Sequence, residues 1–201
     1  MSDAPAERQI YLVRHGETEW SRSGKHTGRT DVPLTDRGRE QAPALGTRLA
    51  GHHFALVLTS PLSRAAETAQ LAGFPDTERA DDLREWDYGE FEGRTTPEIQ
   101  EDIPGWTIWM GPWRGGETPE EVAARVDRVI ARCLDPTVEG DCLLFAHGHV
   151  LRVLAARWVG ASARDGAHFA LGTATLGILG WERTNRVIET WNEACHLDPA
   201  T

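Results

Sequence analysis

Short apolar runs typical of buried strands alternate with helical segments along this chain, and this alternation constrains the fold more than any other feature. The apolar runs occupy residues 10–13, 55–59, 142–146 and 176–181. Helix signals, such as the capping box Thr118-Pro119-Glu120-Glu121, occur over residues 35–50, 60–71, 118–134 and 148–159. Strands that alternate with helices form largely parallel sheets covered on both faces. We therefore predict an α/β fold, a three-layer α/β/α sandwich with a mostly parallel central sheet.

The length of 201 residues is enough for one well-filled core and short for two. We predict a single domain over residues 1–201, with irregular termini at residues 1–8 and 193–201. Two long connections, residues 20–33 and 74–117, are rich in Gly, Pro and polar residues, with one short helix at residues 97–102. Long connections inside a compact domain are usually functional loops or lids.

The charge balance excludes some partners. Acidic residues outnumber basic ones by 31 to 21 without an extended basic stretch, which disfavours nucleic acid and anionic membranes. The first nine residues are polar and no apolar run is long enough to span a bilayer, so we expect a cytoplasmic protein. The three cysteines lack metal-type spacing and are expected to be structural thiols. Four of the eight tryptophans, clustered in the middle of the chain, form either a packed aromatic cap or a pocket wall: Trp86, Trp106, Trp109 and Trp113.

Histidine and glycine follow two of the predicted strands. Arg14-His15-Gly16 ends the first run, and His147-Gly148-His149 ends the run at residues 142–146. Because ligands bind at the carboxyl ends of strands in open α/β sheets, we expect both histidines in one site. Arg64 falls in the first turn of a helix that follows another strand. A cation is unfavourable there unless an anion binds beside it, the alternative being an arginine solvated on the helix surface.

Four ordered segments, spread over nearly the whole chain, resemble the histidine phosphatase superfamily, also called the phosphoglycerate mutase-like family. They begin with Arg14-His15-Gly16-Glu17-Thr18-Glu19-Trp20, continue through Pro33-Leu34-Thr35 with Gly38 and Ser60-Pro61-Leu62-Ser63-Arg64-Ala65, and end with Ala146-His147-Gly148. A lone Arg-His-Gly would be a weak signal, whereas four segments in the same order are a specific one. The resemblance implies a phosphoglycerate mutase-like fold.

The resemblance also implies roles for the matching residues. His15 would attack phosphorus as a neutral ring and form a phosphohistidine, its pKa lowered by the flanking arginines. Arg14 and Arg64 would bind the phosphoryl oxygens in forked pairs, and His147 would add a third cationic donor as an imidazolium. Three converging positive groups would make a metal or other cofactor unnecessary.

A leaving alkoxide requires a proton, and residues 83–93 offer several carboxyl groups. The resemblance points to Glu85 as the proton donor, while the residues alone leave Asp87 almost equally plausible. Ser21 replaces an asparagine that contacts phosphate in many family members, and its hydroxyl can still donate. Thr27 and Gly28 match a point where mutases bind substrate, or they form a plain turn. Gly148, in the last matched segment, is also assigned to substrate binding.

Finer resemblance favours the phosphatases of the family, including sedoheptulose-1,7-bisphosphatase-like and broad acid phosphatase members. Cofactor-dependent phosphoglycerate mutases are typically longer and carry a basic insertion after the donor glutamate, where this chain has acids and tryptophans. We predict hydrolysis of small phosphomonoesters, such as sugar phosphates or bisphosphates, with an acidic to neutral optimum. Exposed tryptophans or a sheet edge could support a homodimer.

The main alternative function is a phosphoglycerate mutase. A non-catalytic phospholigand-binding module is less favoured because all the matched catalytic positions are filled. A metal hydrolase is also less favoured because its candidate ligands have no known metal-binding spacing: His15, His26, His147, His149 and Asp31.

Overall fold

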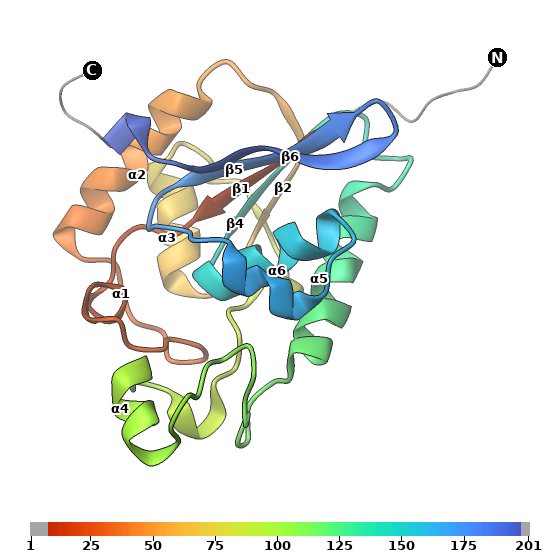
Figure 1. Cartoon of the computed structure of the whole chain (residues 1–201). Helices are drawn as coiled ribbons and strands as arrows, with labels where there is room; N and C mark the ends of the chain where they lie inside the picture. The colour runs from red at the N-terminus through yellow and green to blue at the C-terminus, as the bar shows by residue number, and fades with distance from the viewer. Residues whose placement is uncertain (1–7, 198–201) are drawn as a thin grey trace.

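A six-stranded sheet forms the centre of the computed structural model, which describes residues 8–197 (Figure 1). The strands are β1 (Ile10–Arg14), β2 (Phe54–Thr59), β3 (Glu78–Arg79), β4 (Asp141–Ala146), β5 (Leu176–Glu182) and β6 (Asn185–Glu193). Their order is β3-β2-β4-β1-β5-β6. The first four strands are parallel, β5 is antiparallel to β1, and β6 is antiparallel to β5. The four predicted strands and the largely parallel sheet are confirmed. Sequence reasoning missed β3 and β6.

Helices cover both faces of the sheet, which confirms the three-layer prediction (Figure 1). Helices α2 (Asp36–Leu49) and α3 (Ser63–Leu71) lie on one face, and α5 (Pro119–Cys133) and α6 (Gly148–Trp158) lie on the other. The central strand β1 shows why both faces are apolar. Its alternate residues Ile10 and Leu12 pack in the core beneath α5 and α6, whereas Tyr11 and Val13 pack in the core beneath α2 and α3.

Side-chain caps set most helix starts where the sequence predicts them. Thr118 and Glu121 form the predicted capping box of α5, and Thr35 caps α2 by accepting the Gly38 N–H. Helix α4 (Thr96–Asp102) is the predicted short helix. Helix α3 begins at Ser63, later than predicted, and the five-residue α1 (Glu19–Ser23) was not predicted.

The carboxyl-terminal prediction is partly wrong. Glu193 belongs to β6, and a 3₁₀ turn follows at Cys195–Leu197, so the irregular tail does not begin at residue 193. The predicted irregular residues 1–7 and 198–201 lie outside the described part of the chain. All three cysteines are free thiols, buried at Cys133 and Cys142 and exposed at Cys195.

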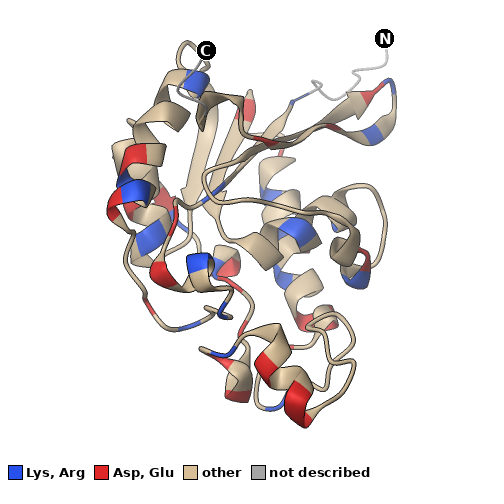
Figure 2. Ribbon diagram, turned by 60° about the vertical axis from the view of Figure 1, so that its left-hand side comes forward, with Lys and Arg blue, Asp and Glu red and all other residues tan. Residues whose placement is uncertain are grey.

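The tryptophans of the middle segment form the aromatic cap, not a pocket wall. Trp86, Trp106 and Trp109 are buried in the core beneath α5 and α6, with Trp113 packed against it. The ribbon in Figure 2 is coloured for acidic residues along α4 and for charged residues of both signs on the outer helices. Within residues 8–197, no helix combines the length and apolar character needed to cross a membrane.

Candidate active site

Two neighbouring parallel strands bring the predicted histidines together. Arg14 at the end of β1 is in register with Ala146 at the end of β4. The His15 N–H donates to the Ala146 carbonyl at 3.0 Å, and His147 is the next residue. The centroids of the His15 and His147 rings are 5.1 Å apart. The expectation of one site at the carboxyl edge of the sheet therefore matches the structure.

Close backbone contacts fix the segment after β1. A Cβ on Gly38 would lie 2.2 Å from the Glu17 carbonyl oxygen, so only glycine allows α2 to start this close to the segment. The Gly16 N–H donates to the Thr68 hydroxyl of α3 at 3.0 Å. The backbone next to His15 is therefore held by two helices.

The His15 ring is neutral, with one nitrogen available as a nucleophile. Its Nδ1 lies 2.7 Å from the Gly16 carbonyl oxygen. Because a carbonyl only accepts hydrogen bonds, we assign the ring proton to Nδ1 and the lone pair to Nε2. Burial, together with the charges of Arg64 and Arg14, holds the pKa of His15 well below 6.5.

His147 is also neutral, which corrects the expectation of an imidazolium. Arg64 Nε donates to His147 Nδ1 at 3.1 Å, so the ring proton lies on Nε2, 2.7 Å from the Ser60 hydroxyl oxygen. Burial and the Arg64 charge hold the pKa of His147 well below 6.5. The ring is fully buried behind His15, outside the cavity wall.

Arg64 donates four of its five N–H groups to protein acceptors. Besides His147, its guanidinium donates to the carbonyls of Thr30, Thr27 and Gly28 at 3.0 to 3.2 Å. The side chain is fully buried, so the solvated alternative is wrong. Nε and Nη2 have these protein partners in the structure, and the expected forked grip on a phosphoryl group stays a prediction. Arg64 holds His147 and the 27–30 loop in place.

Most predicted residues line a cavity of about 270 Å³ beside His15. The predicted residues in its wall are Arg14, His15, Ser21, Thr27, Glu85 and Gly148. Gly28 is absent from this wall, and its assignment to substrate binding stays a prediction. Its N–H donates to Glu92 at 2.9 Å, and a Cβ would lie 2.5 Å from the Trp86 carbonyl oxygen. Gly28 therefore serves loop packing.

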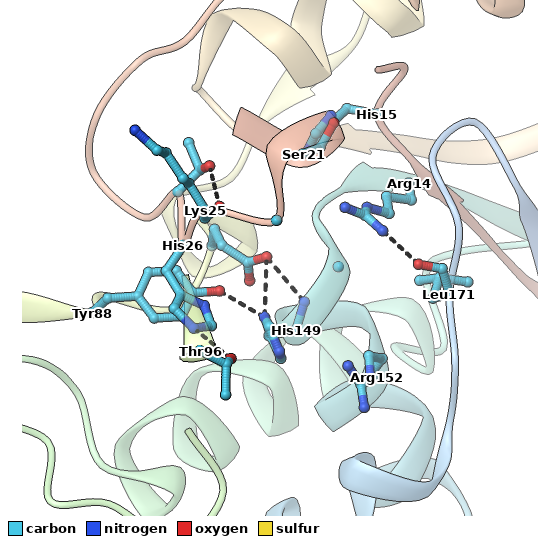
Figure 3. Close-up of a pocket in the computed structure, with 14 residues that line it drawn as sticks. Arg14, His15, Ser21, Lys25, His26, Tyr88, Thr96, His149, Arg152 and Leu171 are labelled. Atoms are coloured by element: carbon cyan, nitrogen blue, oxygen red, sulfur yellow. Dashed lines mark hydrogen bonds and ion pairs between the residues drawn. The ribbon is translucent and has the colours of Figure 1, made fainter. Parts of the chain in front are cut away.

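Arg14 has donor capacity left for an anion. Its Nη1 donates to the Leu171 carbonyl (Figure 3). Its buried Nε has no hydrogen-bond partner among residues 8–197. An unsatisfied buried donor is costly, and an anion in the cavity would remove that cost.

The structure distinguishes the two candidate proton donors. Glu85 Oε1 accepts the N–H groups of Trp86 and Val150, and Oε2 accepts the His149 N–H, each at 2.9 Å. The carboxyl group thus lies at the start of α6, in the cavity wall. Asp87 is outside this wall and pairs with Arg29 at 2.8 Å. Of the two carboxyl groups, Glu85 is the one in the wall of the cavity beside His15.

Sequence reasoning did not assign several cavity residues to the phosphate site: Lys25, His26, Tyr88, Thr96, His149, Arg152 and Leu171 (Figure 3). Helical spacing gave one usable signal, because Arg152 lies three residues after His149 and therefore on the same face of α6. The Tyr88 hydroxyl lies 2.6 Å from His149 Nδ1. Lys25 and Arg152 add positive charge, and Glu85 is the only acid in the wall.

The residues of the metal-site alternative have other partners. His26 Nε2 lies 3.2 Å from the Thr96 hydroxyl oxygen, and Asp31 accepts from the Ser63 N–H and hydroxyl at the start of α3. Between Arg8 and Leu197, no group of three or more His, Cys, Asp or Glu is arranged to hold a metal ion.

The buried histidines should make stability depend on pH. Burial lowers the pKa of His26 from 6.5 to about 4, and the pKa of His15, His147 and His149 also lies well below 6.5. Below about pH 6.5 the unfolded chain therefore binds protons that the folded chain does not. The free energy of unfolding should decrease as the pH is lowered through this range. At about pH 5, His26 alone should cost about 2 kcal/mol.

Urea unfolding at about pH 7.5 and about pH 5 measures this effect. His26→Gln should remove its share of the difference. Equal unfolding free energies at the two pH values in the unmodified protein would contradict the assignment of buried neutral histidines.

Comparisons with known proteins agree with the fold. A family model described as the histidine phosphatase superfamily (branch 1) matches residues 10–194. An acid phosphatase of Mycobacterium tuberculosis is 40% identical over 193 residues, 95% of each chain. Sedoheptulose 1,7-bisphosphatase of Saccharomyces cerevisiae is 40% identical over 181 residues, 74% of this chain and 66% of that protein.

A solved structure supports the same assignment. The product of an open reading frame from Mycobacterium tuberculosis superimposes with a TM-score of 0.87 at 40% identity, covering 92% of this chain and 97% of that one. The family match spans both strand-end histidines and Arg64. The chain therefore belongs to the histidine phosphatase superfamily, as one of its phosphatases.

Proposed function

We propose that the protein hydrolyses small phosphomonoesters through a phosphohistidine on His15. The observation that carries this proposal is the neutral His15 ring, which keeps its Nε2 lone pair in a cavity that also holds Arg14 and Glu85. A protonated ring could not attack phosphorus, so the lowered pKa keeps the nucleophile active in mildly acidic solution.

The reaction then has two steps. His15 Nε2 attacks phosphorus, the bond from phosphorus to the leaving oxygen breaks, and the protonated Glu85 carboxyl gives that oxygen a proton. Water next attacks the phosphohistidine, Glu85 takes up a proton from it, and the N–P bond breaks. Glu85 Oε2 accepts only one N–H bond and so has room for the proton.

Arg14 would stabilise the negative charge that develops on the phosphoryl oxygens, through its unpartnered Nε. In this proposal His147 and Arg64 have a supporting role beside His15. The neutral His147 ring donates its Nε2–H to the Ser60 hydroxyl and lies beside the His15 ring, so it needs no positive charge to hold its place there.

The cavity suits a small anionic metabolite. Its volume of about 270 Å³ is modest, and Lys25 and Arg152 provide positive charge besides Arg14. Sugar phosphates or bisphosphates fit this wall, in line with the names of the acid phosphatase and sedoheptulose 1,7-bisphosphatase relatives. The two extra cations could equally hold a bisphosphorylated cofactor, so phosphoglycerate mutase is the second candidate.

A substrate panel distinguishes the two candidates. Sugar bisphosphates, 3-phosphoglycerate and 4-nitrophenyl phosphate are each incubated with the protein, and both inorganic phosphate and phosphoglycerate isomers are measured. We expect phosphate release from the sugar bisphosphates and the aryl ester, without isomer formation. Isomer formation faster than phosphate release would instead establish the mutase.

A further inference from the structure

Arg125 of α5 is a buried charge outside the cavity wall. Its guanidinium uses all five N–H donors on protein acceptors. Nε and one Nη2 hydrogen bond the Glu117 carboxylate at 2.8 and 3.0 Å. The remaining donors bond to the backbone carbonyls of Asp82, Arg84 and Glu85 at 2.6 to 3.2 Å.

The acceptors of Arg125 surround the residue that we assign as proton donor. Three of them are carbonyls of the segment ending at Glu85. Glu117 holds the other side of that segment, because its carboxylate accepts the Asp87 N–H at 2.9 Å and its carbonyl accepts the Trp86 indole N–H at 2.7 Å. Arg125 and Glu117 therefore fix the backbone on both sides of the Glu85 side chain.

The Glu85 side chain has to bridge this clamped segment and the start of α6. Its carboxyl group meets the N–H groups of His149 and Val150 only if the backbone at residue 85 stays in register with α6. Small errors in the placement of a catalytic group reduce the rate strongly. We propose that Arg125, together with Glu117, is a positioning residue that holds Glu85 in place for proton transfer.

The energetics of buried ion pairs are consistent with this proposal. Apolar residues of similar volume often stabilise a protein as well as a buried ion pair does, so stability alone does not require one here. Five directional donors set the position of a backbone segment in a way that apolar packing does not. The inference rests on the proposed function, because it acts through the proton-donor role of Glu85.

The test uses three phosphate esters whose leaving groups have similar shapes but depend to different extents on receiving a proton from Glu85. Arg125→Gln is assayed by kcat/KM, which reports the phosphorylation step, on 4-nitrophenyl, phenyl and benzyl phosphate. Benzyl alkoxide needs the proton most and 4-nitrophenolate least. We expect a loss on the order of tenfold to a hundredfold with benzyl phosphate, an intermediate loss with phenyl phosphate, and less than about threefold with 4-nitrophenyl phosphate.

Two controls separate positioning from folding. Arg128→Gln removes an exposed arginine on the same helix that pairs with the Asp82 side chain and does not contact the Glu85 backbone. It should leave all three kcat/KM values unchanged. In the Glu85→Gln background, Arg125→Gln should change kcat/KM for benzyl phosphate by less than about twofold, because the group it positions is already disabled.

Equal losses on the three esters, or the full loss again in the Glu85→Gln background, would overturn the proposal. If Arg125→Gln does not fold, Glu117→Gln is used instead, because it keeps the shape of the Arg125–Glu117 pair. It should give the same order of losses among the three esters, each of smaller size. An unmodified protein that hydrolyses none of the esters would refute the proposed function itself, which is a different result from losses that do not depend on the leaving group.

Discussion

Replacing His15 with alanine is expected to lower phosphate release by at least about 10⁴-fold and to abolish the phosphoenzyme. His15 directly follows β1 in the cavity wall, and its Nδ1 contact with the Gly16 carbonyl leaves Nε2 as the nitrogen available for attack. Without it, the phosphoryl group has no covalent acceptor. Brief incubation with a ³²P-labelled substrate, followed by quenching, measures the phosphoenzyme, which should be labile in acid and stable in base.

His168→Ala is the matched control, because this histidine is exposed and outside the cavity wall. It should retain full turnover and full labelling. The reverse outcome, with labelling retained in His15→Ala, would place the nucleophile elsewhere and remove the basis of the two-step mechanism.

The sequence predicted the parts of the site that depend on strand ends. Residues directly after β1 and β4 must lie at the same edge of a parallel sheet, so the meeting of His15 and His147 followed from the apolar runs alone. Thr118 and Glu121 likewise predicted the start of α5, because a capping box is a local hydrogen-bond pattern.

Contacts between distant segments could not be predicted in this way. The 27–30 loop supplies three carbonyls that accept from Arg64, and burial together with the Arg64 charge keeps the His147 ring neutral. A loop conformation has no sequence periodicity, so the bonds from Arg64 to these carbonyls and the neutral state of His147 could not be predicted. Strand β6 was missed for a related reason, because an edge strand with many exposed residues lacks a continuous apolar run.

Glu85→Gln should divide the two chemical steps. An amide cannot supply the proton, so kcat/KM for benzyl phosphate should fall about 10²- to 10³-fold, which corresponds to about 3 to 4 kcal/mol. For 4-nitrophenyl phosphate, the first step needs little help and should be nearly unchanged. The second step still lacks its base, so phosphohistidine should accumulate.

Rapid mixing with 4-nitrophenyl phosphate measures this accumulation as a burst of nitrophenolate approaching one equivalent per enzyme. Asp87→Asn is the matched control, since it makes the same chemical change two residues away at a carboxylate that pairs with Arg29 outside the cavity wall. It should show no burst of nitrophenolate. Its kcat/KM relative to that of the unmodified protein should be the same for every leaving group. If Asp87→Asn showed these effects and Glu85→Gln did not, Asp87 would be the proton donor. The 85–87 segment would then have to rearrange when substrate binds. The clamp by Arg125 and Glu117 opposes that rearrangement, because it holds the backbone on both sides of Glu85.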